Sequence, residues 1–336
     1  MNVKKNNTLE LLKLFASYMV VFIHVVFPGK MGSVVDSLAR FAVPFFFLVS
    51  GFYSYKITYE KIKKRIINIF NLIIISSVCY GVCTMVFNTI VLLIDGNTEG
   101  IASLFSNFFS FTAIANLIFF SVPLSSLHLW YLFAILYVYV IFYFATKFKV
   151  SDKIIFIISF SLLGLNIMLG EGLSLFKVVL PAHIVRNFWI TGIPFFALGL
   201  FVKKYEHKFY KMPNSLIFIS LIAGICECIL CSHYVRNNEL YIGSLFILFA
   251  IVCIFIKYSD IQYPSFLTNL EGCSTYIYIF HIAISTALEA IYTLFWIDTD
   301  FPMILKFIHP VLVCVVSTAF AYFIVKISKT FIKKRN

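Results

Sequence analysis

The sequence predicts an all-α membrane protein with about ten transmembrane helices and with both termini in the cytoplasm. Its 336 residues are 61% hydrophobic and only 12% charged, whereas soluble domains are about 45–50% apolar and about 25% charged. The apolar residues form runs of about 17–25 residues, the length that crosses a hydrocarbon core of about 30 Å. The basic residues stand in short clusters between these runs. These observations indicate a multi-pass protein whose main partner is the lipid bilayer.

Ten apolar runs are long enough to cross the membrane. They cover residues 11–28, 35–55, 66–94, 127–146, 154–170, 187–202, 214–231, 240–256, 272–296 and 303–325. If the N-terminus is cytoplasmic, most of the 27 lysine and arginine residues fall in cytoplasmic segments, as the positive-inside rule requires. The net charge of +12 therefore reflects membrane topology, and we expect no nucleic-acid partner.

The segment between the third and fourth runs, residues 95–127, is the least regular part of the sequence. It contains no lysine or arginine, and serine and asparagine interrupt its apolar middle. A full span here would invert every later loop and break the charge pattern. We therefore expect a re-entrant or interfacial segment on the outer side. The other loops are short, so we expect residues 1–336 to form a single transmembrane domain.

The eight cysteines all lie in or beside predicted spans. Cys226, Cys228 and Cys231 have a spacing similar to that of a metal-binding knuckle, but no second His/Cys pair accompanies them. Small apolar side chains within a helix are the simpler interpretation. We expect no metal site.

The first apolar run contains ionisable residues that a lipid-facing helix would exclude. Eleven helical steps of about 100° place Lys13 and His24 on one face, about 16 Å apart along the axis. Glu10 and Ser17 lie on the same stripe. Each ionisable group at depth costs at least about 2.5–3.5 kcal/mol on insertion scales. The stripe is therefore expected to line a polar cavity or to meet partners on other helices.

The second run places Arg40 near its outer end, before Pro44 and the pair Ser50 and Gly51. Pro44 removes a helical hydrogen bond and frees a carbonyl. Gly51 permits close approach of another helix. Arg40 either belongs to a binding site or extends its guanidinium to the membrane surface.

The order of these motifs resembles the acyltransferase 3 family of membrane acyltransferases. The first two motifs are a basic residue, ten residues and a histidine (Lys13 and His24), and then Arg40, Pro44, Phe45, Phe46, Ser50 and Gly51. Later segments similar to the family's signatures are HLWYL at 128–132, RNFWITGIPFFALGLFV at 186–202 and YIYIFH ending at His281. The resemblance extends from about residue 9 to residue 325. It is also close to the membrane domain of the vancomycin-resistance serine racemases.

The resemblance implies an enzyme of the bacterial plasma membrane that transfers an acyl group, usually acetyl. The donor would be cytoplasmic acetyl-CoA, a co-substrate and not a permanently bound cofactor. The acceptor would be a hydroxyl of a cell-surface glycan or of its lipid-linked precursor. Carried over by position, His24 is the catalytic histidine and Lys13 is its essential basic companion. The family usually has arginine in place of Lys13, and a lysine is a point charge without the planar fork of arginine.

Histidine suits the chemistry of acyl transfer from a thioester to a hydroxyl. The reaction needs a base that takes the hydroxyl proton and a donor that stabilises the oxyanion. The pKa of histidine is ordinarily closest to neutrality, and desolvation favours its neutral form. We expect His24 to act as a general base, with a transient acetyl-His24 as the rival mechanism. Lys13, nearer the cytoplasmic end, is expected to hold the phosphates of CoA.

Five further side chains are expected to bind substrate, and three are expected to support the site. The first group comprises Arg40, His128, Trp130, Arg186 and His281, and the second comprises Glu10, Ser17 and Ser50. Besides Arg40, structural alternatives exist for three of them. Trp130 could belong to an aromatic belt at the interface, Arg186 could be a boundary residue, and His281 could bridge two helices.

A transporter is the alternative function. The membrane domain of the vancomycin-resistance serine racemases has similar signatures and is interpreted as a serine exporter. In a small amino-acid transporter of the same fold, the polar stripe would be the pathway of a zwitterion. A receptor or scaffold without chemistry would not explain Lys13, His24 and Arg40 together.

Overall fold

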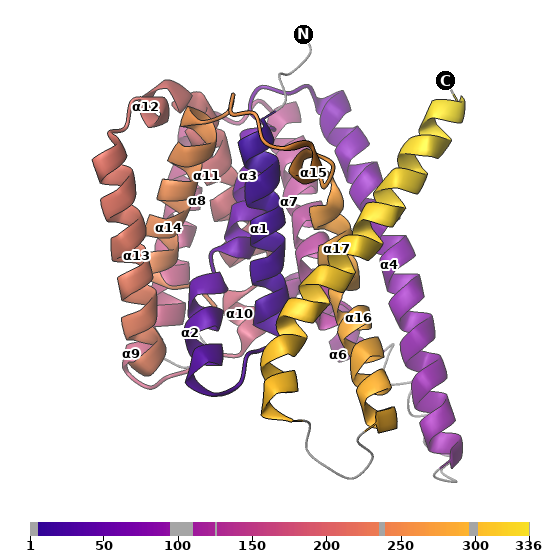
Figure 1. Cartoon of the computed structure of the whole chain (residues 1–336). Helices are drawn as coiled ribbons and strands as arrows, with labels where there is room; N and C mark the ends of the chain where they lie inside the picture. Colours follow the sequence, from indigo (N-terminus) through magenta and orange to yellow (C-terminus); the bar gives the residue numbers. More distant parts are fainter. Residues whose placement is uncertain (1–5, 95–109, 125, 235–238, 296–301, 336) are drawn as a thin grey trace. The chain divides into compact units, whose positions relative to one another are not determined.

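The computed structural model describes residues 6–94, 110–124, 126–234, 239–295 and 302–335. Every regular element in these ranges is a helix (Figure 1). The longer helices are α1 (Asn7–His24), α2 (Gly29–Ala39), α3 (Ala42–Phe52), α4 (Tyr59–Ile94), α6 (Phe111–Phe120), α7 (Trp130–Lys147), α8 (Asp152–Ile167), α11 (Ile193–Lys204), α13 (Asn214–Tyr234), α14 (Ile242–Lys257), α16 (Cys273–Phe295) and α17 (Met303–Arg335). The shorter elements are η1 (Leu127–Leu129), η2 (Met168–Gly172), α9 (Leu173–Leu175), α10 (Ala182–Val185), η3 (Phe188–Gly192), α12 (Glu206–Tyr210) and α15 (Ser265–Thr268).

Eight segments of the described chain are long and apolar enough to cross a membrane, which confirms a polytopic all-α membrane protein. They are Gly29–Phe52, Tyr59–Val86, Leu127–Lys147, Asp152–Leu175, Ala182–Lys204, Asn214–Tyr234, Cys273–Tyr292 and Met303–Thr330. Each overlaps one predicted span. The two remaining predicted spans fall on α1, with 18 residues, and on α14, with 16 residues. The total of ten spans and the cytoplasmic position of both termini stay predictions.

The second predicted span begins earlier than residue 35 and is broken in the middle. Helix α2 ends at Ala39, and α3 begins at Ala42. Pro44 has no N–H to donate to the carbonyl of Arg40, so the helical ladder stops there. Arg40 consequently becomes the C-terminal cap of α2.

Two other helices extend beyond their predicted ends. Helix α4 begins at Tyr59 instead of residue 66, and α17 continues to Arg335 instead of residue 325. Both extensions are rich in lysine, a good helix former. An apolar window locates the part of a helix that fits the bilayer, and it misses the polar turns that continue into water.

Helix α6 is the one described helix within the irregular segment 95–127. The Ser110 hydroxyl caps its start by accepting a hydrogen bond from the Ala113 N–H at 3.2 Å. Its ten residues rise about 15 Å, which is too short to cross a membrane. Residues 95–109 and 125 lie outside the described residues, and the re-entrant or interfacial placement stays a prediction.

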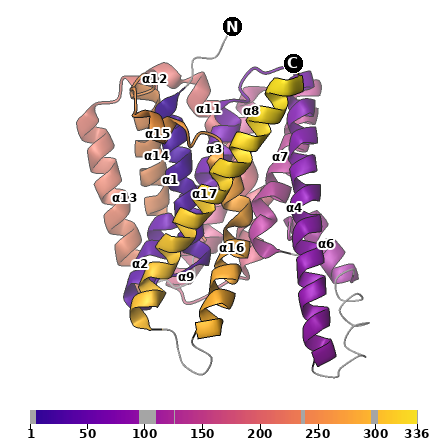
Figure 2. The same ribbon diagram turned by 45° about the vertical axis from the view of Figure 1, so that its right-hand side comes forward.

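The chain divides into two compact units. The first unit comprises Met1–Phe46, Gly170–Val179 and Tyr205–Asn336, and the second comprises Phe47–Leu169 and Leu180–Lys204. In the first unit, α13 packs along α14 and α16 packs along α17, as both views show (Figures 1 and 2). In the second unit, α4 packs on α7 and α8 packs on α11. The prediction of a single domain over residues 1–336 stays a prediction.

Helix α1 is held in the core of the first unit. Its buried Leu14 and Val21, and Val25 just after its end, pack with residues of α16 and α17, among them Ile277 and Val313. Burying such a side chain contributes about 1.5–3 kcal/mol relative to exposure to water, but lipid tails are also apolar, so here the gain comes mainly from packing. The consequence is that α1 has a fixed rotation against α16.

Polar contacts fix the ends and the middle of α1. The Asn6 carboxamide caps the first turn by accepting from the Leu9 N–H at 2.9 Å, and its Nδ2 donates to the Phe255 carbonyl of α14 at 2.8 Å. In the middle of α1, the Tyr18 hydroxyl lies 2.9 Å from the hydroxyl of Thr318. These bonds add to the packing and leave α1 no room to slide along its neighbours.

Two glycines bring α3 and α11 into close contact within the second unit. A Cβ atom on Gly51 would overlap the carbonyl of Phe196, and one on Gly199 would overlap the carbonyl of Leu48. The helices therefore touch backbone to backbone, as small residues at helix crossings allow. The structure confirms the prediction that another helix approaches closely at Gly51.

Candidate active site

The basic residue and the histidine of the first motif lie on one unbroken helix, α1. Lys13 Nζ is 2.5 Å from Glu10 Oε1, one turn earlier. The buried Ser17 donates its hydroxyl hydrogen to the Leu14 carbonyl at 2.6 Å. Because α1 has no break between Lys13 and His24, their separation along the axis is about 16 Å, as the sequence predicts.

His24 is the last residue of α1 and lies beside a second histidine. The ring centroids of His24 and His281 are 5.3 Å apart, with an angle of 36° between the ring planes. His24 is half-buried, and His281 on α16 is 0% exposed. Helix α1 ends here because the chain turns into Pro28 and Gly29, the latter with φ +65°. The structure thus brings together two of the sequence-predicted site residues.

The hydrogen bonds of His281 define which of its ring nitrogens carries a proton. Nδ1 lies 2.8 Å from the Tyr278 carbonyl and 3.2 Å from the Ile277 carbonyl. Carbonyl oxygens only accept, so Nδ1 is the donor and Nε2 carries the lone pair of the neutral ring. These bonds fix the ring orientation of His281 against His24.

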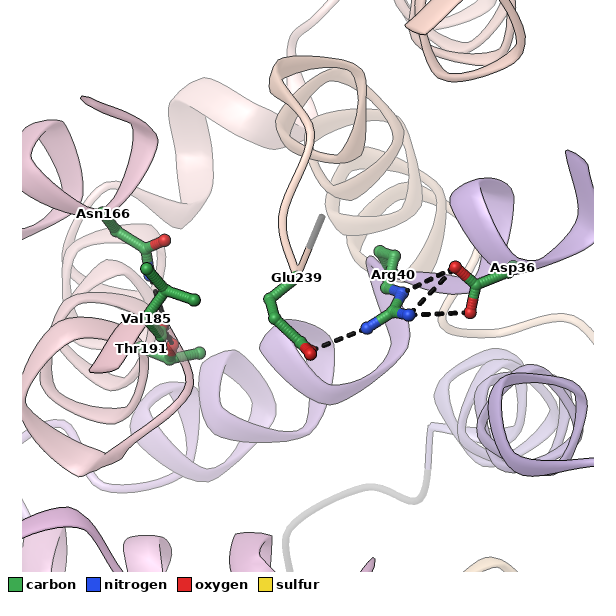
Figure 3. A network of polar contacts seen from close by, with 6 residues as sticks. All are labelled: Asp36, Arg40, Asn166, Val185, Thr191 and Glu239. Carbon is green, nitrogen blue, oxygen red and sulfur yellow. Dashed lines mark hydrogen bonds and ion pairs between the residues drawn. The ribbon is translucent and has the colours of Figure 1, made fainter. Parts of the chain in front are cut away.

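Arg40 is enclosed by two carboxylates (Figure 3). Its Nε and Nη2 donate to Asp36, with distances of 2.8 Å to Oδ1 and 2.9 and 3.1 Å to Oδ2. Its Nη1 donates to Glu239 Oε2 at 2.6 Å. The side chain is only 12% exposed, so the guanidinium is largely buried between these two carboxylates. Two carboxylates thus share one guanidinium.

Arg40 lines a cavity of about 690 Å³ in the first unit. Its polar lining includes Lys30, Asp36, Arg40, His233 and Tyr241. Ile23 and Val26, on either side of His24 in the sequence, also line it, but His24 is not among its lining residues. The volume lies within the range of about 300–1,000 Å³ found for ligand pockets. The sequence analysis gave no role to His233, and only the fold reveals its position.

The second unit brings Trp130 and Arg186 together. The Arg186 guanidinium carbon lies 5.5 Å from the centre of the Trp130 ring, a cation–π contact. Trp130 is 5% exposed and also packs on Phe47, so it is not a lipid-exposed belt residue. His128, buried nearby in the sequence, meets the ring of Tyr80 edge-on at 4.9 Å. Trp130 is therefore part of the interior of this unit, and the half-buried Arg186 covers its ring.

Ser50 belongs to the second unit as well. Its carbonyl accepts from the Ser54 hydroxyl at 2.6 Å and from the Tyr139 hydroxyl at 3.4 Å. Arg65 donates to the same Ser54 hydroxyl at 2.7 Å. The serine thus lies in a hydrogen-bonded junction that ties α3 to α4 and α7.

A buried asparagine that the sequence analysis missed orders the turn beside Arg186 (Figure 3). Asn166 Nδ2 donates to the Ile190 carbonyl at 2.8 Å and lies 3.2 Å from Thr191 Oγ1, which donates to the Val185 carbonyl at 2.9 Å. The turn, η3, is a π-helix, a form that leaves backbone groups to be satisfied by side chains. A lone asparagine in an apolar run is the only sequence signal.

An acidic cluster in the first unit also escaped the sequence analysis. Ligand atoms of Glu171, Glu227 and Cys231 lie within 4.8 Å of one another. However, Glu171 accepts from the Ile242 N–H and Glu227 from the Gly243 N–H, each at 2.6 Å. These are the first N–H groups of α14, which need acceptors and favour negative charge. The two carboxylates therefore act as caps, although the sequence alone favours a packing role for Glu227.

Comparison with known proteins gives one family match. A family model described as an acyltransferase domain, Acyl_transf_3, matches residues 6–326. The match covers all ten residues that the sequence analysis assigned to a site. No curated protein and no solved structure gives a significant match.

Proposed function

Because the chain belongs to the acyltransferase 3 family of membrane acyltransferases, we propose that it is an O-acetyltransferase of the cell envelope. It transfers an acetyl group from acetyl-CoA to a hydroxyl of a cell-surface glycan or of its lipid-linked precursor, in the bacterial plasma membrane. The observation that carries the proposal is the pair formed by His24 and the buried His281, with ring centroids 5.3 Å apart. A histidine held in this way is suited to proton transfer.

In the proposed reaction, His24 is the general base. It takes the proton of the acceptor hydroxyl while that oxygen attacks the carbonyl carbon of the thioester. The carbon–sulfur bond then breaks, and His24 returns the proton to the departing thiolate, so that no net proton is released. In the rival mechanism, His24 attacks the thioester carbonyl first, the carbon–sulfur bond breaks, and CoA leaves as the thiol with a proton from the ring. The acceptor hydroxyl then takes the acetyl group from His24 and returns its own proton to the ring.

His281 is assigned to positioning. Its Nδ1–H is committed to the carbonyls of Tyr278 and Ile277, so the neutral ring presents a lone pair on Nε2. The fixed ring of His281 restricts the rotation of the His24 imidazole. Because the His281 ring is neutral and polarisable, it also stabilises the positive charge that His24 gains during the reaction.

Lys13 is assigned to the phosphates of CoA. It lies three turns before His24 on α1, at the end that is predicted to be cytoplasmic. The pantetheine arm would follow α1 from Lys13 to His24 and present the thioester to the imidazole. Glu10, which pairs with Lys13 at 2.5 Å, keeps the ammonium in place before CoA binds.

The acceptor is assigned to the cavity beside Arg40. The cavity offers charged and hydroxyl groups, including Asp36, Lys30 and Tyr241, and such groups bind the hydroxyls of a sugar. It borders α1 at Ile23 and Val26, next to the catalytic histidine. Donor and acceptor would then approach His24 from opposite ends of the helix.

The experiment uses membrane vesicles that contain the full chain, endogenous glycan and acetyl-CoA labelled in its acetyl group. Wild-type vesicles should transfer label to glycan, and vesicles with His24→Ala should not. His207→Ala, which removes an exposed histidine of α12, is the matched control and should retain transfer. Uptake of labelled serine without acetyl transfer would instead favour the transporter.

A further inference from the structure

Four side chains between α16 and α17 form a hydrogen-bonded chain that the proposed mechanism does not use. Ser285 donates to Glu289 Oε1 at 3.1 Å, and its oxygen lies 2.9 Å from His309 Nε2. Since Ser285 has a single hydrogen, His309 Nε2–H donates to it. In the neutral ring, His309 Nδ1 then accepts from the Tyr292 hydroxyl at 3.3 Å. The chain has one direction, from Tyr292 to the carboxylate of Glu289.

This arrangement does not make Ser285 a nucleophile. In a catalytic triad, the carboxylate binds the imidazole nitrogen opposite to the serine. Here Glu289 Oε1 is 3.2 Å from His309 Nε2, the same nitrogen that contacts Ser285. The hydroxyl hydrogen of Ser285 points to a carboxylate and not to a base on the ring. The chain therefore serves to position Glu289, not to activate a hydroxyl.

The chain lies close to the catalytic pair along α16. Ser285 lies one helical turn after His281, and Glu289 lies two turns after His281, so the three side chains share one stripe of the helix. The His281 ring lies beside that of His24, with centroids 5.3 Å apart. A polar path thus leads from the catalytic pair along α16 to Glu289, which is 53% exposed.

Glu289 and His309 line a cavity of about 290 Å³. Its other lining residues include Val26, Pro28, Tyr292 and Lys306. A carboxylate that accepts hydrogen bonds, an ammonium and an imidazole converge here on apolar walls, which is the composition of a small-molecule site. The cavity is at the small end of the range for ligand pockets, about 300 Å³, the scale of one sugar residue.

Val26 lines both this cavity and the larger cavity beside Arg40. It follows His24 by two residues, so both cavities border the segment just after α1. A ligand that occupied both cavities would pass over the chain segment next to the catalytic histidine. Such a ligand must be longer than one sugar residue.

We propose that the cavity lined by Glu289 and His309 is a second acceptor subsite, so that the acceptor is a glycan of at least two sugar residues lying across Val26. This inference rests on the proposed acetyltransferase function. One sugar residue occupies the Arg40 cavity, and its neighbour hydrogen-bonds to Glu289 and Lys306 while its C–H face packs on Tyr292. The stripe on α16 aligns this neighbour with His24.

The test measures acetyl transfer from labelled acetyl-CoA to envelope glycan that has been hydrolysed and separated by size. For the full-length wild type in proteoliposomes, the KM should fall about ten-fold or more from one sugar residue to two or three, the effect of added hydrogen bonds to charged groups. Glu289→Gln and Ser285→Ala should remove most of this gain, so that their effect on KM grows with acceptor length. Glu60→Gln, an exposed site on α4, is the control and should match the wild type.

The outcomes separate the inference from the function on which it rests. A wild type that transfers label with a KM independent of acceptor length overturns the second subsite and leaves the acetyltransferase intact. The second subsite is also overturned, and the acetyltransferase left intact, if Glu289→Gln and Ser285→Ala reduce transfer equally to acceptors of every size. Damage to packing would lower transfer without regard to acceptor length. A wild type that labels no size fraction overturns the acetyltransferase proposal itself, and the subsite with it.

Discussion

Arg40 and His24 belong to neighbouring helices of the first unit, and their surroundings differ in kind. Arg40 has a complete set of opposite charges, from Asp36 on its own helix and from Glu239 ahead of α14. His24 has another imidazole, that of His281, as its close neighbour. A buried cation requires counter-charges, but an imidazole can be neutral and still exchange a proton. The comparison separates a residue that holds the fold from one that is suited to chemistry.

Removal of the His24 side chain should produce the largest effect, a loss in the rate of acetyl transfer. General acid–base catalysis contributes about 10²–10⁴-fold, so acetyl transfer by His24→Ala should fall by about that factor. The half-buried ring adds little packing at the end of α1, so the melting temperature should stay within about 2 °C of the wild-type value. For a chain of this size, that shift corresponds to a change of less than about 1 kcal/mol in the free energy of unfolding. Transfer assays and thermal unfolding of the purified protein check both parts; wild-type activity in the variant would refute the role of His24.

Removal of Arg40 should instead lower stability. In Arg40→Ala, Asp36 and Glu239 would be left without their cation, and breaking a buried ion pair costs about 3–5 kcal/mol. Thermal or denaturant unfolding in detergent measures the loss. The exposed Lys30, which shares the cavity, provides the matched variant Lys30→Ala, expected to change stability by less than about 0.5 kcal/mol. Equal stabilities of the two variants would show that the Arg40 cluster does not hold the fold.

The second unit offers a sharper contrast between two glycines. In Gly51→Ala, the new methyl would overlap the Phe196 carbonyl, and such overpacking costs about 1–3 kcal/mol. A methyl added to Gly164 on α8 would have no neighbouring atom within 4 Å, so Gly164→Ala should stabilise the helix by about 0.5–1 kcal/mol. Opposite shifts in melting temperature are expected; a shift of the same sign in both would argue against the close α3–α11 contact.

Most helices could be predicted from the sequence because hydropathy and charge are properties of local segments. The break at Arg40 was implied by Pro44, and the close contact of α3 was implied by Gly51. The predicted ends of α4 and α17 fell short because lysine-rich turns continue a helix beyond the apolar part. In each of these cases, the physical cause lies within a few residues of its effect.

The candidate site could be predicted only in part. His24 and Lys13 share a helix, so their spacing was available from the sequence. The contact of His24 with His281 depends on how α1 packs against α16, which no local pattern encodes. Asp36 was within reach of prediction, since it precedes Arg40 by four residues on one helix face, whereas Glu239 reaches Arg40 only through the fold. The hydrogen-bonded chain of Ser285 and His309 likewise needs two helices in contact, so the sequence alone favours a packing role for His309.

The smallest expected effect concerns Lys13, where the family usually has arginine. If Lys13 holds the CoA phosphates, Lys13→Arg should lower the KM for acetyl-CoA by a few-fold, because a planar guanidinium binds phosphate with two parallel hydrogen bonds and an ammonium does not. The kcat should change little, since His24 stands about 16 Å away along the helix. Lys13→Ala should raise the same KM and leave the KM for the acceptor unchanged. If neither substitution alters the KM for acetyl-CoA, Lys13 serves the fold through Glu10, and CoA must be held by other residues.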